Sequence, residues 1–168
     1  GNISGNENIA IAKDCDLMIL SIPYDYIDDM CGKLSKVVKE NSIIISPIVP
    51  MKKSVDGFEY IPVKEKSESA AEMVASKMPP RSRIVSALHT ISEVKLKHLD
   101  ESLDCDTFVC GDDADNVSIV SKLIQEIRGL RPLYLGPLSL SYQAEMMTPM
   151  LLNVSKLNKI RHPGLKIV

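Results

Sequence analysis

The sequence predicts an α/β fold, with a mainly parallel, doubly wound sheet covered by helices on both faces. Three observations support this fold class: short apolar segments of strand length, amphipathic segments that alternate with them, and short connections between the two kinds. The five expected strands are Leu17–Ile22, Ser42–Ser46, Ile84–Ala87, Thr107–Cys110 and Pro132–Leu135.

In the first half of the chain, helical segments alternate with the first two strands. Glu7–Ala12 suggests a short helix, and Pro23 ends the first strand. Tyr24–Val38 carries apolar residues at helical spacing between charged ones, which predicts an amphipathic helix against the sheet. Pro47–Pro50 ends the second strand, because proline has no N–H to donate to a neighbouring strand. A polar loop is expected from Met51 to Lys66.

The second half continues the alternation. Ser69 and Glu72 have the spacing of a capping box, which predicts a helix over Ala70–Met78 that ends at two prolines. A short helix is expected over Glu93–Leu99. Apolar residues recur at helical spacing from Asn116 to Ile127, which predicts another helix against the sheet.

The segment Leu138–Lys159 is expected to form a long helix that is apolar over more than one stripe. Such a helix is either buried in the core of its own chain or part of a subunit interface, for which adaptable Met side chains are suited. Pro149 is expected to kink or reset the helix. The apolar residues of this segment include Met146, Met147, Met150, Leu151, Leu152, Val154 and Leu157.

The composition argues against several functional classes. The 168 residues include 20 basic and 22 acidic side chains that are mixed along the chain, and only 4% are aromatic, so nucleic acid is not an expected partner. The 4 cysteines form no CxxC pair and are interpreted as reduced, mostly buried thiols rather than zinc ligands or disulfides. No apolar run is long enough to span a bilayer and no leader is recognisable, so we expect no membrane partner and a cytoplasmic location.

The stretch Ile84–Ile91 gives the first indication of a functional site. Its β-branched start is typical of a strand buried on both faces, and Ser86 and Ala87 then leave room for a ligand near the backbone. His89 and Thr90 follow where such a strand ends. The carboxyl ends of parallel strands form the ligand crevice of open α/β sheets, so a pocket is expected here.

Seven short strings follow one another along nearly the whole chain: Ser21–Pro23, Ile45–Pro50, Val85–Ile91, Val109–Asp113, Gly129–Pro132, Gly136–Ser139 and Pro163–Lys166. Together they resemble the F420-dependent NADP reductase family. The resemblance implies a Rossmann-like domain with a C-terminal helical extension, usually a homodimer, that transfers a hydride between coenzyme F420 and NADP.

The chain departs from the family pattern at its beginning. The family opens with a strand and a Gly-rich turn that holds the pyrophosphate of NADP, whereas this sequence contains no G-x-G-x-x-G string. We therefore expect residues 1–137 to be the remainder of a Rossmann-type domain that is truncated at its N-terminus, and residues 138–168 to be the helical extension. The strand at Leu17–Leu20 would then have an open edge. We therefore expect either that the given chain is a fragment or that another chain covers Leu17–Leu20.

The resemblance also implies which residues contact the cofactors. Tyr26 stands where the family often has a basic residue or histidine. Ile91 is expected to press on a ring face, and His89 to donate a hydrogen bond to a cofactor, although a lone histidine at a strand end is as often a structural residue. The remaining expected contacts are Ser21, Ile22, Pro23, Ser46, Pro47, Val49, Pro50, Ala87, Thr148, Gly164 and Leu165.

Two charged pairs are also candidate ligand sites. Lys52 and Lys53 could attract the phosphate or polyglutamate tail of F420, but a role as solvated loop charges is favoured. Asp112 and Asp113 resemble a metal pair, but no His or Glu accompanies them, so a turn and helix-capping role is favoured and no metal is expected.

Two alternatives to the F420-dependent reductase remain open. The chain could be a non-catalytic fragment or assembly module that keeps the helical extension. It could also be a related Rossmann reductase that uses NADP with another acceptor. Hydride transfer itself needs neither a nucleophile nor a metal, since the protein mainly stacks two rings and excludes water.

Overall fold

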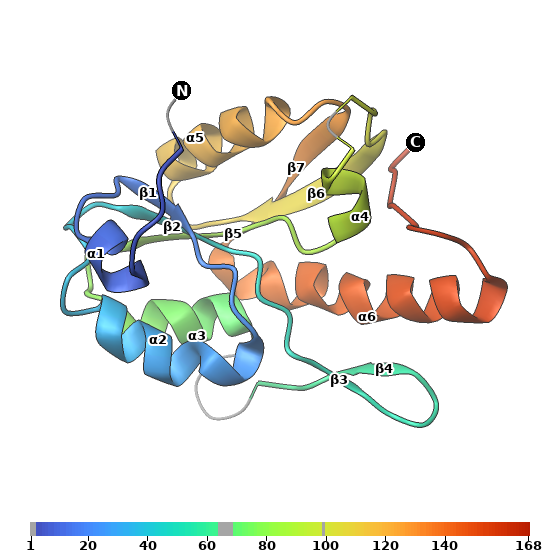
Figure 1. The fold of residues 1–168 in the computed structure, drawn as a ribbon, viewed down its shortest axis with the longest axis horizontal. Coiled ribbons are helices and arrows are strands. Elements are labelled where there is room, and N and C mark those ends of the chain that lie inside the picture. Colours follow the sequence, from blue (N-terminus) through green and yellow to red (C-terminus); the bar gives the residue numbers. More distant parts are fainter. Residues whose placement is uncertain (1–2, 64–68, 99) are drawn as a thin grey trace.

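A five-stranded sheet forms the centre of the molecule in the computed structural model, which describes residues 3–63, 69–98 and 100–168 (Figure 1). The strand order β1-β2-β5-β6-β7 places β5 in the middle. The pairs β1–β2, β2–β5 and β6–β7 are parallel, whereas β5 meets β6 in antiparallel fashion at Ser86 and Cys110. The strands are β1 (Leu17–Ile19), β2 (Ile43–Ser46), β5 (Arg83–Ser86), β6 (Cys105–Cys110) and β7 (Leu130–Gly136).

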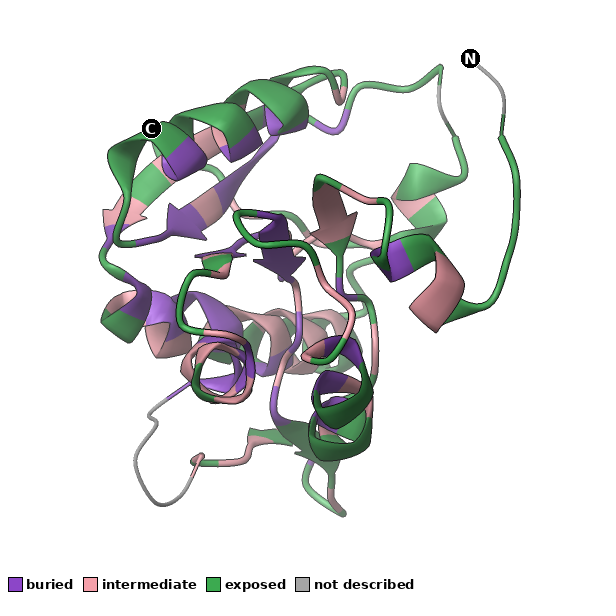
Figure 2. Cartoon of the chain, turned by 90° about the vertical axis from the view of Figure 1, so that its left-hand side faces the viewer, coloured by how far each residue is buried: buried purple, intermediate pink, exposed green. Residues whose placement is uncertain are grey.

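Helices cover both faces of this sheet, as the sequence predicted. Helices α1, α2 and α3 lie on one face and α5 on the other, with α6 running beside α3 (Figure 1). Figure 2 shows the buried residues gathered on the strands and on the helix faces turned toward them. The helices are α1 (Asn8–Ala12), α2 (Ile27–Leu34), α3 (Ala70–Lys77), α4 (Glu93–Leu96), α5 (Ala114–Gln125) and α6 (Ser141–Asn158), with short 3₁₀ turns η1 (Tyr24–Tyr26) and η2 (Leu138–Leu140).

The alternation of side chains along the strands divides the core into two clusters. In β2, Ile44 joins a cluster with residues of α2 and α3, whereas Ile43 and Ile45 join a second cluster with residues of α5. All three isoleucines are buried, as expected for a strand covered on both faces. The doubly wound, mainly parallel α/β fold predicted from the sequence is therefore confirmed.

Helix α3 begins at the predicted capping residue. The Ser69 hydroxyl accepts a hydrogen bond from the backbone N–H of Glu72 at 3.1 Å, and it also lies 3.1 Å from the Glu72 carboxylate. This arrangement satisfies one of the N–H groups that have no partner inside the helix.

Several helical segments are shorter than predicted. The helix expected over Tyr24–Val38 consists of η1 followed by α2, and α2 ends at Leu34. Close turns follow, in which the N–H groups of Val37 and Val38 both bond to the carbonyl of Leu34, and Asn41 then takes a positive φ of 68° before β2. The helix expected over 93–99 ends at Leu96, and residue 99 lies outside the described residues.

The largest error of the sequence prediction is the loop expected at 51–66. Residues Met51–Lys53 (β3) and Phe58–Tyr60 (β4) instead form an antiparallel hairpin, and residues 64–66 lie outside the described part of the chain. The sequence does not predict this hairpin, because its strands are short and carry charged residues. Gly57, with φ of 152°, shapes its turn, and a Cβ there would lie 2.3 Å from the Asn153 side-chain oxygen of α6.

Helix α6 continues through Pro149, so the predicted reset is wrong. The helix is fixed to other elements on both sides of this proline, through Glu145 before it and Asn153 after it, which keeps both halves in one helix. Its fully buried residues are small or polar, whereas Met146, Met150 and others remain partly exposed. The helix thus packs on its own chain along one side only.

The C-terminal segment returns along β6. The N–H of Asp106 donates to the carbonyl of Leu165 at 2.7 Å, and the Asp106 carboxylate accepts from the N–H of Ile167 at 2.6 Å. Arg131 bonds both oxygens of Asp106, at 2.7 and 2.8 Å, and the carbonyl of Ile167. This network, which we call the C-terminal clamp, fixes the segment next to the sheet.

Strand β1 forms one edge of the sheet. Within residues 3–63, 69–98 and 100–168 it pairs with β2 alone, and Ile19 is 49% exposed. This agrees with the expected open edge. The expectation of a fragment or of a covering chain stays a prediction, and so does the division into residues 1–137 and 138–168. In the same described ranges, no helix is both long and apolar enough to cross a membrane.

Candidate functional site

A cavity of about 400 Å³ lies where the central strand β5 ends, between the hairpin, helix α6 and the C-terminal segment. Its position at the carboxyl end of β5 matches the crevice that open α/β sheets use for ligands. The lining residues are Met51, His89, Thr90, Ile91, Ser92, Glu93, Thr148, Leu151, Leu152, Ser155, His162 and Pro163. We call this space the β5 cavity.

The loop after β5 is held in an unusual backbone conformation. Leu88 has a φ of 70°, a left-handed conformation that costs energy for a residue with a branched side chain. Two hydroxyls stabilise the loop: Thr107 accepts from the N–H of Leu88 at 3.2 Å, and Thr148 of α6 donates to the carbonyl of His89 at 2.7 Å. The wall of the β5 cavity is therefore fixed from both β6 and α6.

His89 lies at the base of this loop with its ring almost completely buried. The Ser86 hydroxyl is 3.3 Å from its Nε2 atom, and the ring also bonds to the backbone of Ser46. Burial lowers the pKa of His89 to about 4, so the ring is neutral at physiological pH. Because its ring already has partners in the protein, His89 fits the structural role that the sequence analysis gave as the alternative to cofactor contact. It also lines the β5 cavity.

Polar side chains, among them Ser92, Glu93 and His162, line part of the cavity. The Ser92 hydroxyl lies 3.2 Å from Nδ1 of His162, which links the loop after β5 to the C-terminal segment. His162 has a φ of 50°, and the C-terminal clamp holds the residues that follow it. The apolar side chains of Ile91, Leu151 and Leu152 line another part of it.

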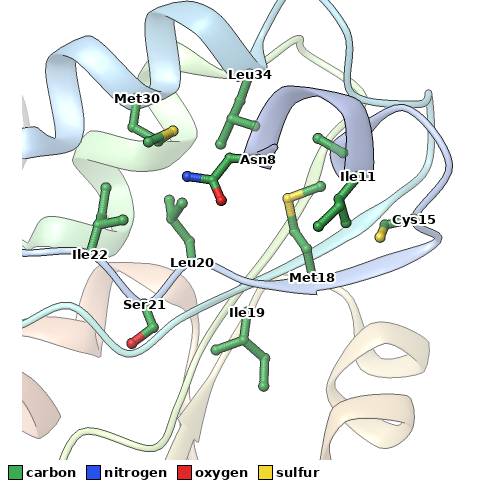
Figure 3. A pocket seen from close by; sticks show the side chains of 11 residues that line it. Asn8, Ile11, Cys15, Met18, Ile19, Leu20, Ser21, Ile22, Met30 and Leu34 are labelled. Atoms are coloured by element: carbon green, nitrogen blue, oxygen red, sulfur yellow. The ribbon is translucent and has the colours of Figure 1, made fainter. Parts of the chain in front are cut away.

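A second, smaller cavity of about 210 Å³ lies beside the edge strand β1. In Figure 3 the side chains of Asn8, Leu20 and Ile22 point toward one another below Met30 and Leu34, while Ser21 and Ile19 lie on the other side of the strand. No Lys or Arg is among the residues described as lining it.

The structure distributes the predicted site residues over several places. His89, Ile91 and Thr148 line the β5 cavity, whereas Ser21 and Ile22 line the β1 cavity, and the two cavities share no lining residue. Tyr26 is 59% exposed in η1. The stretch from Ser46 to Pro50 begins at the end of β2, where Ser46 is fully buried beside Ser86 of β5.

The remaining predicted residues do not line the β5 cavity. Ala87 is fully buried in the core cluster that α5 covers. Gly164 packs against Cys105, where an added Cβ would approach to 3.0 Å, and the carbonyl of Leu165 belongs to the C-terminal clamp. Pro163 lines the cavity in their place. Pro23, Pro47, Val49 and Pro50 are among neither set of lining residues.

The sequence reasoning missed several residues that build this site. Met51 is expected in a loop, and the sequence predicts no site role for Ser92 or His162. The same holds for Glu145, which lies outside the cavity lining. Glu145 is the hardest to anticipate, because a single acidic residue in an apolar helix is read as a point on its solvent face, and here it is fully buried. One feature of the sequence could have indicated its burial: Glu145 lies in a Met-rich stretch with no basic residue nearby.

Asp112 and Asp113 have the favoured turn and capping role, whereas Lys52 and Lys53 lie in strand β3 and not in the expected loop. Asp113 caps α5 by accepting from the N–H of Asn116 at 2.8 Å, and Asp112 accepts from the N–H of Leu138 at 2.9 Å. Lys52 forms an ion pair with Glu59 across the hairpin. No group of three or more His, Cys, Asp or Glu side chains suited to a metal occurs among the described residues.

The cysteines are free thiols, as expected. Cys31, Cys105 and Cys110 are buried and Cys15 is half-buried. Burial raises the pKa of Cys31 and of Cys110 to about 11, which keeps both thiols protonated and unreactive at neutral pH.

The fold and the site together define the chain as a Rossmann-like α/β protein with a ligand cavity at the end of its central strand. A solved structure, a candidate F420-dependent NADP-reductase from Arthrobacter sp. FB24, superposes with a TM-score of 0.81 at 18% identity, covering 95% of this chain and 73% of the other. This similarity shows the shared fold. No family model matches the sequence.

Curated relatives identify the family. The F420-dependent NADP reductase of Methanocaldococcus jannaschii is 32% identical over 166 residues, which cover 99% of this chain and 74% of the relative. The enzyme of the same name from Methanothermobacter marburgensis is 26% identical over 166 residues, with 98% and 74% covered. The chain belongs to the F420-dependent NADP reductase family.

Proposed function

We propose that the protein transfers a hydride between coenzyme F420 and NADP, and that F420 binds in the β5 cavity. The observation that carries this proposal is a ligand-sized cavity at the end of the central strand of a chain that belongs to this reductase family. Its volume of about 400 Å³ lies within the usual range of small-molecule sites. Its lining combines apolar and polar side chains, which suits a flat ring with polar edges.

When bound, F420 supplies the ring that carries the hydride, and the chain supplies its surroundings. Ile91 limits how far a ring can move from the end of β5, and Leu151 and Leu152 exclude water from one side. Thr148 keeps the loop carbonyl of His89 engaged, so the cavity wall stays in place. We propose that the neutral His89 ring holds this wall in place. It could hydrogen-bond to a cofactor only by giving up its hydrogen bond to the backbone of Ser46.

The residues around the β1 cavity fit the phosphates of NADP poorly. Asn8, Cys15 and Ser21 are the polar residues among those lining it, and none carries a positive charge. Phosphate sites in proteins normally combine backbone N–H groups at a helix N-terminus with basic side chains. We therefore assign no step to groups of this cavity. The expected NADP contacts at Ser21, Ile22, Pro23, Tyr26, Ser46, Pro47, Val49, Pro50 and Ala87, and the expected F420 contacts at Gly164 and Leu165, stay proposals.

Turnover tests the proposal. Reduced F420 is mixed with the protein, NADP is added, and the return of the oxidised F420 spectrum is followed. The proposal predicts NADP-dependent oxidation that Leu152→Trp, which fills the cavity, lowers at least tenfold. Oxidation by another acceptor and not by NADP would identify a related reductase instead, and a folded protein without either activity would contradict the proposal.

We further infer that the protein forms a homodimer through α6. Met146, Met150 and Val154 recur every four residues on this helix and are 47%, 48% and 38% exposed, and Leu157 is 74% exposed. An apolar stripe of this length on a helix is typical of a subunit interface, and Met is common in such interfaces. The cytoplasmic location and the absence of nucleic-acid partners stay predictions from the sequence.

A further inference from the structure

The most unusual polar group outside the cavity lining is the carboxylate of Glu145 in α6. Its side chain is fully buried, and no salt bridge within residues 3–63, 69–98 and 100–168 includes it. An isolated buried carboxylate is costly, since it loses its hydration without gaining a cation. Its retention in the interior requires compensating contacts.

Among the residues that the structure describes, three hydrogen bonds supply this compensation, and they come from two other elements. The N–H of Ala70 donates to Oε2 at 3.0 Å and the N–H of Ala71 donates to Oε1 at 3.1 Å, both in the first turn of α3. The Tyr60 hydroxyl of β4 donates to Oε2 at 3.0 Å. The free N–H groups and the positive end of the helix dipole at the start of α3 favour a negative charge at this point.

A second polar contact joins the same helix to the same hairpin. The Asn153 side chain accepts from the N–H of Phe58 at 2.8 Å and donates to the carbonyl of Phe58 at 2.7 Å. Glu145 and Asn153 therefore fix the hairpin at two points along α6. We call these two contacts the hairpin clasp.

The β5 cavity lies against the elements that the hairpin clasp joins. Met51, which pairs with Tyr60 in the hairpin, lines the cavity from one side. Thr148 stands one helical turn after Glu145 and bonds the carbonyl of His89. Leu151 and Leu152 follow between Glu145 and Asn153 on α6. A shift of the hairpin relative to α6 would change the distance between these walls.

We propose that Glu145 is a positioning residue for the β5 cavity: its carboxylate joins α3 and the hairpin to α6 and thereby sets the separation of Met51 from the α6 wall. The proposal rests on the proposed function only where it predicts F420 kinetics. The positioning of the hairpin itself is a property of the folded chain and can be measured without any cofactor.

The contact is coupled to pH. Burial raises the pKa of Glu145 to about 7, although its three hydrogen bonds oppose this shift. The titratable groups that face it are Tyr60 of β4, Glu72 of α3, Tyr24 of η1 and Cys110 of β6. A protonated carboxyl accepts less well from three donors, because one oxygen then carries a proton. These three hydrogen bonds should therefore weaken as the pH falls below about 7, even though protonation favours the folded chain as a whole by removing the cost of a buried charge.

Steady-state kinetics and hydrogen exchange test the proposal in Glu145→Gln, with the exposed Glu126→Gln as a matched control. In Glu145→Gln we expect the KM for F420 to rise about tenfold, because a hydrogen bond to a charged group is lost. The values of kcat and of the KM for NADP should change less than twofold. The rise of the wild-type KM for F420 on acidification toward pH 6 should disappear. The amides of Phe58, Ala70 and Ala71 should exchange about tenfold faster, while those of Ile44 and Ile45 in β2 stay unchanged.

A second variant keeps the test decisive if Glu145→Gln does not fold. Tyr60→Phe removes one of the three donors and should accelerate exchange at Phe58 while Ala70 and Ala71 remain protected. Unchanged hairpin exchange in both variants would overturn the proposal, as would equal rises of both KM values. If the wild-type protein shows no F420 turnover, the proposed function fails, and hairpin exchange alone then decides whether Glu145 positions the cavity wall.

Discussion

At the scale of single residues, two buried groups respond to pH in opposite directions. The pKa of His89 is lowered to about 4 from 6.5, so its contribution to stability is complete above about pH 6.5 and is lost as the pH falls toward 4. The pKa of Glu145 is raised to about 7 from 4.5, so its contribution is complete below about pH 4.5 and is lost as the pH rises through 7. Between these limits the two effects partly cancel.

Single variants should separate the two effects. His89→Gln should remove the loss of stability on acidification from pH 6.5 to 4, and Glu145→Gln should remove the loss on raising the pH from 4.5 to 7. Urea denaturation at several pH values measures both, with Glu126→Gln as the surface control. Parallel pH dependences of stability in His89→Gln and the wild type would show that the ring is not buried and neutral.

The hydroxyl of Thr148 gives a residue-scale prediction for the cavity wall. Thr148→Val keeps the shape of the side chain but removes the donor to the carbonyl of His89. We expect it to lower the free energy of unfolding by about 1 kcal/mol and to weaken F420 binding, because the loop after β5 loses one of its two supports. Thr148→Ser keeps the hydroxyl and should bind F420 like the wild type. Equal binding by the Val and Ser variants would contradict a role for the hydroxyl.

At the scale of elements, strands and helices with strong apolar patterns were predictable, whereas elements held by tertiary contacts were not. The continuous isoleucines of β2 and the capping box of α3 identified their elements from local sequence. The hairpin β3–β4 could not be found this way, because Asn153 and Glu145, distant in sequence, hold it against α6. The continuity of α6 through Pro149 has the same origin.

The C-terminal segment is an element whose position depends on one carboxylate. Arg131 hydrogen bonds hold the pKa of Asp106 at about 2, so Asp106 is ionised at neutral pH. Asp106→Asn weakens the pair with Arg131 and the contact to the N–H of Ile167. We expect faster hydrogen exchange at Ile167 and weaker F420 binding, since His162 and Pro163, which line the cavity, precede this clamp. Exchange at Ile167 equal to that of the wild type would show that the clamp does not hold the segment.

At the scale of the whole molecule, the sequence predicted the fold and the family, but only part of the site. The strings that resemble the family mark strand ends, and strand ends meet at one edge of the sheet, so His89 and Ile91 lie together at the β5 cavity, which Thr148 lines from α6. The distribution of the expected contacts over two cavities could not be predicted, because a short sequence string does not show which cavity its residues line. The buried position of Glu145 depends on packing between three elements and has no local pattern.

The proposed homodimer is also a property of the whole molecule. Met150→Glu introduces a charge into the exposed stripe of α6 without disturbing its buried side. Analytical ultracentrifugation should show a dimer for the wild type and a monomer for this variant, because a charge buried in an apolar interface is costly. Ile119→Glu, on the exposed side of α5, should leave the dimer intact. A monomeric wild-type protein would contradict the homodimer.

The assignment of F420 to the β5 cavity is tested most directly by binding calorimetry with F420. The wild-type protein should bind saturably at one site per chain, and Leu152→Trp, which fills the cavity, should weaken binding at least tenfold. Leu123→Trp, the same substitution on the exposed side of α5, should bind like the wild type. Equal affinity of the Leu152→Trp variant and the wild type, with both proteins folded, would contradict the account.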